Sequence, residues 1–312
     1  MTIIKCQQIE MSSNEQKKIR LNTETDHCEN KNEEESEKSA ESFQSLTFKL
    51  EDLPDEVILK VFSYLENNTD RIRSGHVSQR LRAISNDESL WHKVNFFEKT
   101  VPTSFIQFVL EKGCRFLSLC QTSLHGSLNL TKPTKLKHLN LNLCVVENVK
   151  NGTLQELVAA CHSLENLTLC VSDQYCSRLS KFNVIETLCR QNKQTLKVFY
   201  FKFFQNYMNS DIAQCIAYSC RELKEVSIIG KANKGVSHEA IKILVDNLSP
   251  NVEKLRLEMR GITDEHVKVL VKKCNKLTDL ILESKYITNK SVTNIKEHLP
   301  NLEKLKCFKL EN

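Results

Sequence analysis

The chain has 312 residues, of which 40% are hydrophobic and 27% are charged, with 7 Gly and 5 Pro. These proportions are typical of a soluble protein with a buried core, and they exclude collagen-like and linker-dominated chains. The net charge is +5, but residues 1–45 contain six Lys or Arg and ten Asp or Glu, a net −4 that leaves +9 for the remainder. No apolar stretch is long enough for a signal peptide or a membrane span, so we expect neither.

The first 46 residues are polar and poor in aromatic residues, and they include the run NKNEEESEKSAES. Such a segment cannot bury enough apolar surface to fold, so we expect residues 1–46 to form a disordered acidic tail. We interpret the 13 Cys as reduced thiols of a protein in the cytoplasm, the nucleus or both. No C-x-x-C pair occurs, so the usual spacing of a structural zinc site or a redox dithiol is missing.

An amphipathic helix is predicted in the segment LTFKLEDLPDEVILKVFSYLENN. Pro54 suits the first position of a helix, where its missing N–H would have no partner, and two carboxylates follow it. Two apolar stripes run side by side at helical spacing, namely Val57, Val61 and Leu65, and Ile58 and Phe62. A helix that is apolar over so much of its circumference has to pack on two sides. Because the segment is too small for a large core of its own, the second side suggests a partner protein.

One or two further helices, ending at the only Trp of the chain, are predicted in DRIRSGHVSQRLRAISNDESLWHKVNF. Together, LPDEVILKVFSYL and HVSQRLRAISNDESLW resemble the F-box, a helical module that docks on the Skp adaptor of cullin-based ubiquitin ligases. The resemblance covers about residues 48–95, and we place the domain at 47–95. It departs from the usual Cys and Trp of the third helix, where this chain has Ser78 and Leu81. By the resemblance, the expected contacts with the adaptor are Leu53, Pro54, Ile58, Phe62 and Leu65.

The rest of the chain repeats the pattern L-x-x-L-x-L at intervals of 25–32 residues. Its copies are Leu136/Leu139/Leu141, Leu164/Leu167/Leu169, Leu196/Phe199/Phe201, Leu223/Val226/Ile228, Val252/Leu255/Leu257, Leu277/Leu280/Leu282 and Leu302/Leu305/Cys307. A weaker copy, Phe116/Leu119, is expected to start the array after a helix around SFIQFVLEKG. This interval is that of leucine-rich repeats, in which each unit is a short strand followed by a helix.

The helices of the later units have recognisable starts. Ser237, Thr263 and Thr288 are suitable N-cap residues, and the apolar residues behind them fall at helical spacing. Three cysteines each lie three residues before the first Leu of a unit, namely Cys161, Cys220 and Cys274. That constant place favours small buried thiols over metal ligands or nucleophiles.

The repeated segment resembles the cysteine-containing leucine-rich repeats of the F-box/leucine-rich-repeat protein family, the substrate-recognition subunits of SCF ubiquitin ligases. The resemblance spans about residues 100–312, and we place about 7–8 units in residues 96–312. It implies an α/β fold, in which a small all-α F-box domain precedes a leucine-rich-repeat solenoid. Parallel strands would line its concave face and helices its outside. The Cys or Asn that the family carries three residues after L-x-L is present only as Cys144.

Enzymatic alternatives find little support in the sequence. The stretch VSIIGKANKGVSHEAI places Gly230 and Gly235 between a strand and a helix, but Val236 stands where a phosphate-binding loop needs Lys. The motifs H-E-x-x-H, G-x-S-x-G and G-x-G-x-x-G do not occur. The positive charge is spread along the chain without a basic cluster interleaved with aromatic residues, which argues against nucleic acid. We therefore expect no catalytic residue, no cofactor and no metal.

The two modules predict one function. The F-box would hold the Skp adaptor, and through it the cullin and RING subunits, while the repeats would hold a target protein for ubiquitination. Strand residues that alternate with buried ones point out of the concave face. Among them, the expected target contacts are Tyr200, Lys202, Arg256, Ile281, Lys306 and Phe308. The alternative is a leucine-rich-repeat scaffold with a degenerate F-box and no ligase role, supported by Ser78 and Leu81.

Overall fold

The computed structural model describes residues 50–65, 67–142, 145–146, 153–171, 181–204, 208–231 and 236–309. The predicted acidic tail, Cys144 and Gly235 lie outside the described residues. Lys49–Asn312 forms a compact unit, in which a small helical region is followed by a parallel sheet.

The helical region consists of η1 (Leu50–Asp52), α1 (Asp55–Ser63), α2 (Asn68–Ser74), α3 (Gln79–Ser85) and η2 (Glu88–Trp91). Pro54 is the N-cap of α1 rather than its first residue. Asn67 caps α2 by accepting a hydrogen bond from the backbone N–H of Thr69. Ser78 caps α3 in the same way, by accepting a hydrogen bond of 3.2 Å from the backbone N–H of Leu81. Leu81 itself is buried, so both departures from the F-box pattern have structural roles here.

Among the described residues, nine strands form a parallel sheet in the order β1-β3-β5-β7-β8-β9-β10-β11-β12. Their bounds are β1 (Lys93–Phe97), β3 (Phe116–Cys120), β5 (His138–Asn142), β7 (Asn166–Val171), β8 (Val198–Phe204), β9 (Glu225–Lys231), β10 (Lys254–Glu258), β11 (Asp279–Ser284) and β12 (Lys304–Lys309). A smaller parallel sheet within the same ranges contains β2 (Thr100–Pro102), β4 (Ser123–His125) and β6 (Val145–Val146).

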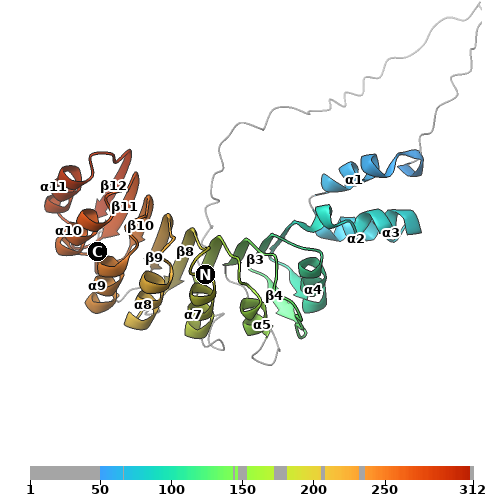
Figure 1. Cartoon of the computed structure of the whole chain (residues 1–312), viewed down its shortest axis with the longest axis horizontal. Coiled ribbons are helices and arrows are strands. Elements are labelled where there is room, and N and C mark those ends of the chain that lie inside the picture. The colour runs from blue at the N-terminus through green and yellow to red at the C-terminus, as the bar shows by residue number, and fades with distance from the viewer. Residues whose placement is uncertain are drawn as a thin grey trace, which may run out of the picture. The chain divides into compact units, whose positions relative to one another are not determined.

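Helices connect most of the strands of the large sheet. They are α4 (Thr103–Glu111), α5 (Thr153–Ala159), α7 (Lys181–Gln191), α8 (Ser210–Ser219), α9 (His238–Asn247), α10 (Asp264–Lys273) and α11 (Asn289–His298). These helices lie along one side of the sheet (Figure 1). The predicted caps Ser237, Thr263 and Thr288 are confirmed as the N-caps of α9, α10 and α11. In the part of the chain that the structure describes, no helix is both long and apolar enough to cross a bilayer.

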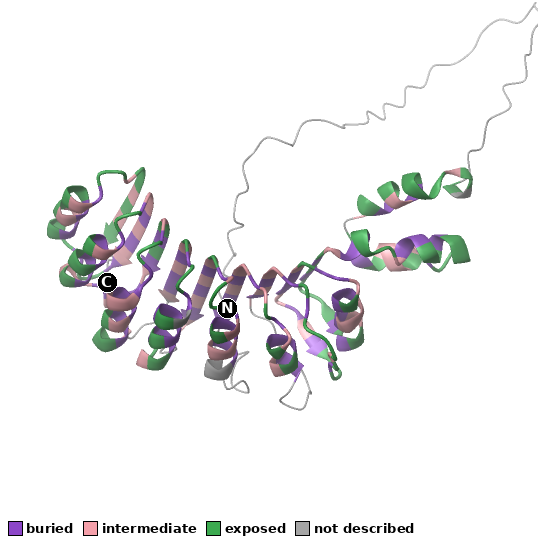
Figure 2. Ribbon diagram, viewed as in Figure 1, coloured by how far each residue is buried: buried purple, intermediate pink, exposed green. Residues whose placement is uncertain are grey.

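The L-x-x-L-x-L residues form continuous rows inside the sheet. The strand register pairs Leu139 with Leu167 and Leu255 with Leu280, and each of these side chains is at most 2% exposed. Their neighbours along each strand are more exposed, so burial alternates from residue to residue (Figure 2). This register confirms the inward positions predicted for the units from Leu136 onward, and the outward ones except Cys170 and Ile229, which are buried.

The weak first copy has a different register from the predicted one. β3 pairs with β5 so that Leu117 lies opposite Leu139. Leu117 and Leu119 are fully buried, whereas Phe116 is only partly buried. The sequence pattern points to Phe116 because it stands three residues before Leu119. In the structure the first core position belongs instead to the fully buried Cys114, three residues before Leu117.

The sheet also begins one strand earlier than the pattern predicts. The segment after η2, for which the pattern predicts no strand, forms β1, which places Val94 opposite Leu117 and Phe96 opposite Leu119. Trp91, Val94 and Phe96 thus repeat the core spacing of the later units. Trp91 is 1% exposed, and a single hydrophobic cluster runs from the helical region into the sheet.

Candidate functional site

Trp91 fixes the helical region against the sheet. Its indole Nε1 donates a hydrogen bond of 2.9 Å to the carbonyl of Ser85. Its ring meets those of Phe105 and Phe108 on α4 edge to face, with centroids 5.7 and 5.3 Å apart. Asn68 of α2 also donates a hydrogen bond of 3.2 Å to a backbone carbonyl of β1. Because these contacts are directional and mostly buried, surfaces on the helical region and on the sheet are held in a fixed relation.

Helix α1 turns one apolar stripe inward and the other outward. Ile58 and Phe62 are 0% and 2% exposed and pack in the core of the chain, so their side chains do not reach the surface. This placement corrects the sequence-based assignment of both residues as adaptor contacts. On the neighbouring face of the helix, Val57, Val61 and Tyr64 are 43%, 41% and 72% exposed.

The other predicted adaptor residues lie beside the outward stripe. Pro54 is exposed, whereas Leu53 and Leu65 are partly buried against the core. Leu50, at 41% exposure, adds another apolar side chain to the surface. Exposed apolar residues gathered on one helix of a soluble domain are typical of a protein-binding site. We name these residues the α1 surface: Leu50, Pro54, Val57, Val61 and Tyr64.

Three rows of outward-facing side chains cross the sheet, and the strand register aligns each row. The start row is His138, Asn166, Val198, Glu225, Lys254, Asp279 and Lys304. The middle row is Asn140, Thr168, Tyr200, Ser227, Arg256, Ile281 and Lys306. The end row is Asn142, Cys170, Lys202, Ile229, Glu258, Glu283 and Phe308. Two members of the end row, Cys170 and Ile229, are only 8% and 4% exposed, so this row presents fewer side chains than the spacing suggests.

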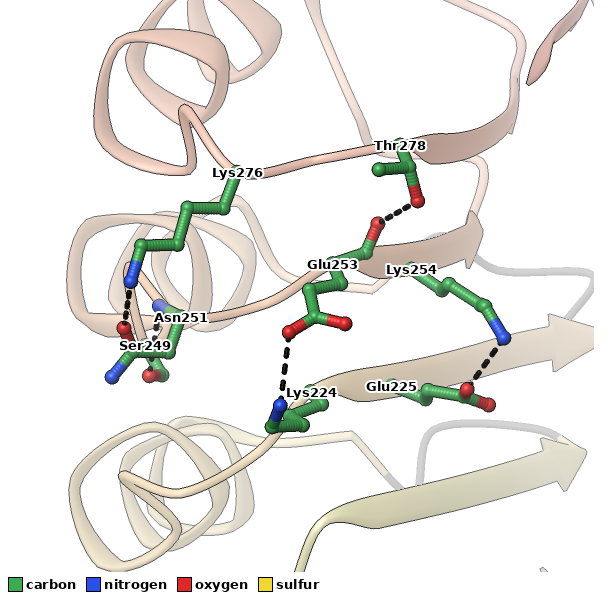
Figure 3. Close-up of polar contacts among 8 residues, drawn as sticks. All are labelled: Lys224, Glu225, Ser249, Asn251, Glu253, Lys254, Lys276 and Thr278. Atoms are coloured by element: carbon green, nitrogen blue, oxygen red, sulfur yellow. Dashed lines mark hydrogen bonds and ion pairs between the residues drawn. The ribbon is translucent and has the colours of Figure 1, made fainter. Parts of the chain in front are cut away.

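Charges at the beginning of the strands are paired between neighbours. Lys254 Nζ lies 2.6 Å from Glu225 Oε1, and this hydrogen bond and charge raise the pKa of Lys254. Lys224 Nζ lies 3.1 Å from Glu253 Oε1, and the hydroxyl of Thr278 donates to the backbone carbonyl of Glu253 (Figure 3). These contacts link three consecutive strands. Because the positive and negative side chains neutralise each other, the start row offers little net charge to a ligand.

A cleft of about 260 Å³ opens on this face of the sheet across β8 to β12. It brings together three of the predicted target residues, Tyr200, Arg256 and Ile281. In the middle row the short side chain of Ser227 lies between Tyr200 and Arg256, which leaves space between the longer ones. Arg256 Nη2 lies 2.5 Å from Glu258 Oε1. Within the described residues the Ser227 Oγ is buried without a hydrogen-bond partner. A bound group with a donor or an acceptor would remove the free-energy cost of this missing hydrogen bond.

The other three predicted target residues lie outside this cleft. Lys202 is partly buried in the end row, with its Nζ 5.5 Å from the centre of the Phe204 ring. Lys306 is exposed and Phe308 is 53% exposed on β12. Sequence reasoning missed the start-row part of the cleft lining, which includes Val198. The same alternation that identifies the middle row also identifies the start row, so the signal was present in the spacing.

The cysteines at the recurrent place in the units are buried. Cys161, Cys220 and Cys274 are at most 1% exposed, as predicted from their constant place in the units. Burial raises the pKa of Cys161 to about 12 and that of Cys274 to about 11, so both stay protonated at neutral pH. Across the ranges that the structure describes, no group of three or more His, Cys, Asp or Glu is placed to hold a metal ion.

Comparison with protein-family models identifies the helical region. Residues 50–97 match the F-box-like family, a stretch that runs from η1 to the end of β1 and includes Trp91 and the α1 surface. A search of curated proteins finds no matching relative. The chain therefore carries an F-box-like domain, followed by a mixed α/β region built on a nine-stranded parallel sheet in its described part.

Proposed function

We propose that this protein is a non-catalytic adaptor that recognises substrates for an SCF-type ubiquitin ligase. The F-box-like domain holds the Skp adaptor, and through it the cullin and RING subunits. The following region is a leucine-rich-repeat solenoid of about 7–8 units, whose concave face holds the target protein. The observation that carries the proposal is an F-box-like domain whose first helix leaves an apolar stripe exposed. The protein would act in the cytoplasm, the nucleus or both, without a cofactor.

The repeat interpretation rests on spacing and register together. Equivalent residues of successive units lie directly opposite one another, as Val226, Leu255 and Leu280 do on β9, β10 and β11. Each of these three units then continues into a capped helix on the same side of the sheet (Figure 1). A strand and a helix in each unit, repeated every 25–32 residues, is the pattern of leucine-rich repeats.

In this role the protein contributes proximity rather than chemistry. Partner enzymes transfer ubiquitin, and the adaptor raises the effective concentration of target lysines near them. The packing of Trp91 on α4, together with the 3.2 Å hydrogen bond from Asn68 on α2 to the carbonyl of Asn95 on β1, stiffens the junction between the two modules. A stiff junction keeps a target on the sheet within a narrow range of distances from the ligase.

A charge introduced into the α1 surface tests the adaptor contact. Val61 is 41% exposed, so Val61→Asp leaves the fold intact but places an unpaired carboxylate in the proposed interface. We expect the affinity for the Skp adaptor, measured by co-purification and titration, to fall at least about tenfold. The matched control is Val269→Asp on α10, where the valine is 40% exposed, and it should bind like the wild type.

The outcomes separate the two functions that the sequence leaves open. If all three proteins bind the Skp adaptor equally, the α1 surface is excluded as the contact. If none of them binds it, the ligase role is refuted. A scaffold without a ligase role would then remain. For the target site, proximity labelling in cells should lose partners when Tyr200 and Ile281 are both changed to Ala, because both line the sheet cleft. An unchanged set of labelled proteins would exclude the cleft as the target site.

A further inference from the structure

A second cleft, of about 260 Å³, opens where the F-box-like domain meets the sheet region. It shares no lining residue with the sheet cleft or with the α1 surface. Its apolar wall contains the rings of Trp91, Phe105 and Phe108. The indole stands on edge against both phenyl rings, which stack on each other at 5.9 Å and 21°. This packing fixes the orientation of all three rings, so the wall is preformed for a planar apolar group.

The charged part of the same lining is cationic. Its charge is that of Arg82, which lies beside the imidazole of His76, and the lining contains no Asp or Glu. Arg82 Nε donates a 3.3 Å hydrogen bond to a backbone carbonyl, and among the described residues no carboxylate pairs with the guanidinium. Lys112 adds a second cation beside this lining, with its Nζ 5.8 Å from the centre of the Phe108 ring. The carboxylate of Asp87 is already engaged, because it accepts hydrogen bonds from the backbone N–H and the hydroxyl of Ser89.

We propose that this junction cleft binds a small aromatic carboxylate, with its ring on the aromatic wall and its carboxylate on Arg82. A guanidinium matches a carboxylate with two parallel hydrogen bonds, which favours this anion over a neutral group. The volume suits a molecule of one ring and one acid group better than a folded segment of a partner. The ligand would touch both α3 and α4, so its binding would also stabilise the junction between the two modules.

The only Trp of the chain lies in the wall of the cleft and reports on binding. The full chain is titrated with phenylacetate while the fluorescence of Trp91 is recorded, and we expect a saturable change. Phenylacetamide has the same ring without the charge, and it should bind at least about tenfold more weakly, because it loses the charge-assisted hydrogen bonds. The proposal is overturned by the absence of a saturable signal, or by equal affinity for the two probes.

Two variants and the ligase adaptor complete the test. Arg82→Gln should raise the Kd for phenylacetate about tenfold or more, whereas Arg73→Gln should not, since Arg73 on α2 is exposed and lies 3.8 Å from Asp70. An unchanged Kd in Arg82→Gln contradicts the site. The complex with the Skp adaptor should bind phenylacetate like the free chain. A loss of binding in the complex would indicate that the Skp adaptor itself covers the cleft. Titration of the free chain does not depend on the proposed ligase role, so the two proposals fail independently.

Discussion

Replacement of Leu255 by Ala tests the register of the sheet in the middle of a buried row. Leu255 is 2% exposed and lies between Val226 on β9 and Leu280 on β11. The substitution removes three carbon atoms from the core, and at about 0.8 kcal/mol for each the lost transfer free energy is about 2.4 kcal/mol. The cavity left between two packed neighbours brings the expected loss of unfolding free energy to about 2–5 kcal/mol.

Two matched substitutions separate burial from position along the chain. Leu305 occupies the same row on β12, at the end of the strand order, and is only partly buried. Leu305→Ala should therefore cost roughly half as much as Leu255→Ala. Arg256 is adjacent to Leu255 but faces outward, with 45% of its side chain exposed and an ion pair to Glu258. Because this pair is open to solvent on the arginine side, Arg256→Ala should cost about 1 kcal/mol, well below the cost of Leu255→Ala.

Urea unfolding followed by circular dichroism gives the three free energies on one scale. The expected order of destabilisation is Leu255→Ala, then Leu305→Ala, then Arg256→Ala. Equal losses for Leu255→Ala and Arg256→Ala would refute the assignment of inward and outward side chains. Equal losses for the two leucine variants would refute the weaker packing of the row at β12.

Two further predictions concern titration and thiol reactivity. Burial, and then the neighbouring His238, lower the pKa of His266. His266 therefore takes up its proton at a higher pH in the unfolded chain than in the folded chain. The unfolding free energy should consequently decline as the pH falls below about 6.5. His266→Gln, which preserves a side chain able to cap α10, should flatten that part of the pH profile, and an unchanged profile would contradict the reasoning. Cys161 and Cys274 should resist iodoacetamide at neutral pH until the protein unfolds, because burial raises the pKa of these thiols to about 12 and about 11. Mass spectrometry of the alkylated peptides checks this, and rapid labelling of either thiol in the native protein would disprove it.

The repeated spacing was sufficient to predict the faces of most strands. Side chains alternate along a strand, so the buried Leu positions also identify the outward ones. Tyr200 and Arg256 were predicted to face outward on this basis, and both line the sheet cleft. The first two strands escaped the pattern because their first core positions are occupied by Trp91 and Cys114 rather than Leu.

Helix α1 shows what periodicity alone leaves undecided. The stripe of Ile58 and Phe62 and the stripe of Val57 and Val61 have the same helical spacing and similar apolarity. Which stripe is buried depends on α3 and η2, and both of these elements contact α1. They bury Ile58 and Phe62 and leave the valines outside, so two of the residues that the resemblance suggested are closed to a partner, whereas Pro54 is exposed.

The sequence by itself determined the repeating units, their alternation of strand and helix, and the presence of an F-box-like segment before them. These features depend on periodicity and on short motifs, which are local properties of the chain. Only the tertiary structure decided which face of α1 is free, that Trp91 belongs to the core of both modules, and where two clefts open. Each of these depends on side chains that are distant in sequence and meet only when the units stack, so a pattern along the chain does not contain them.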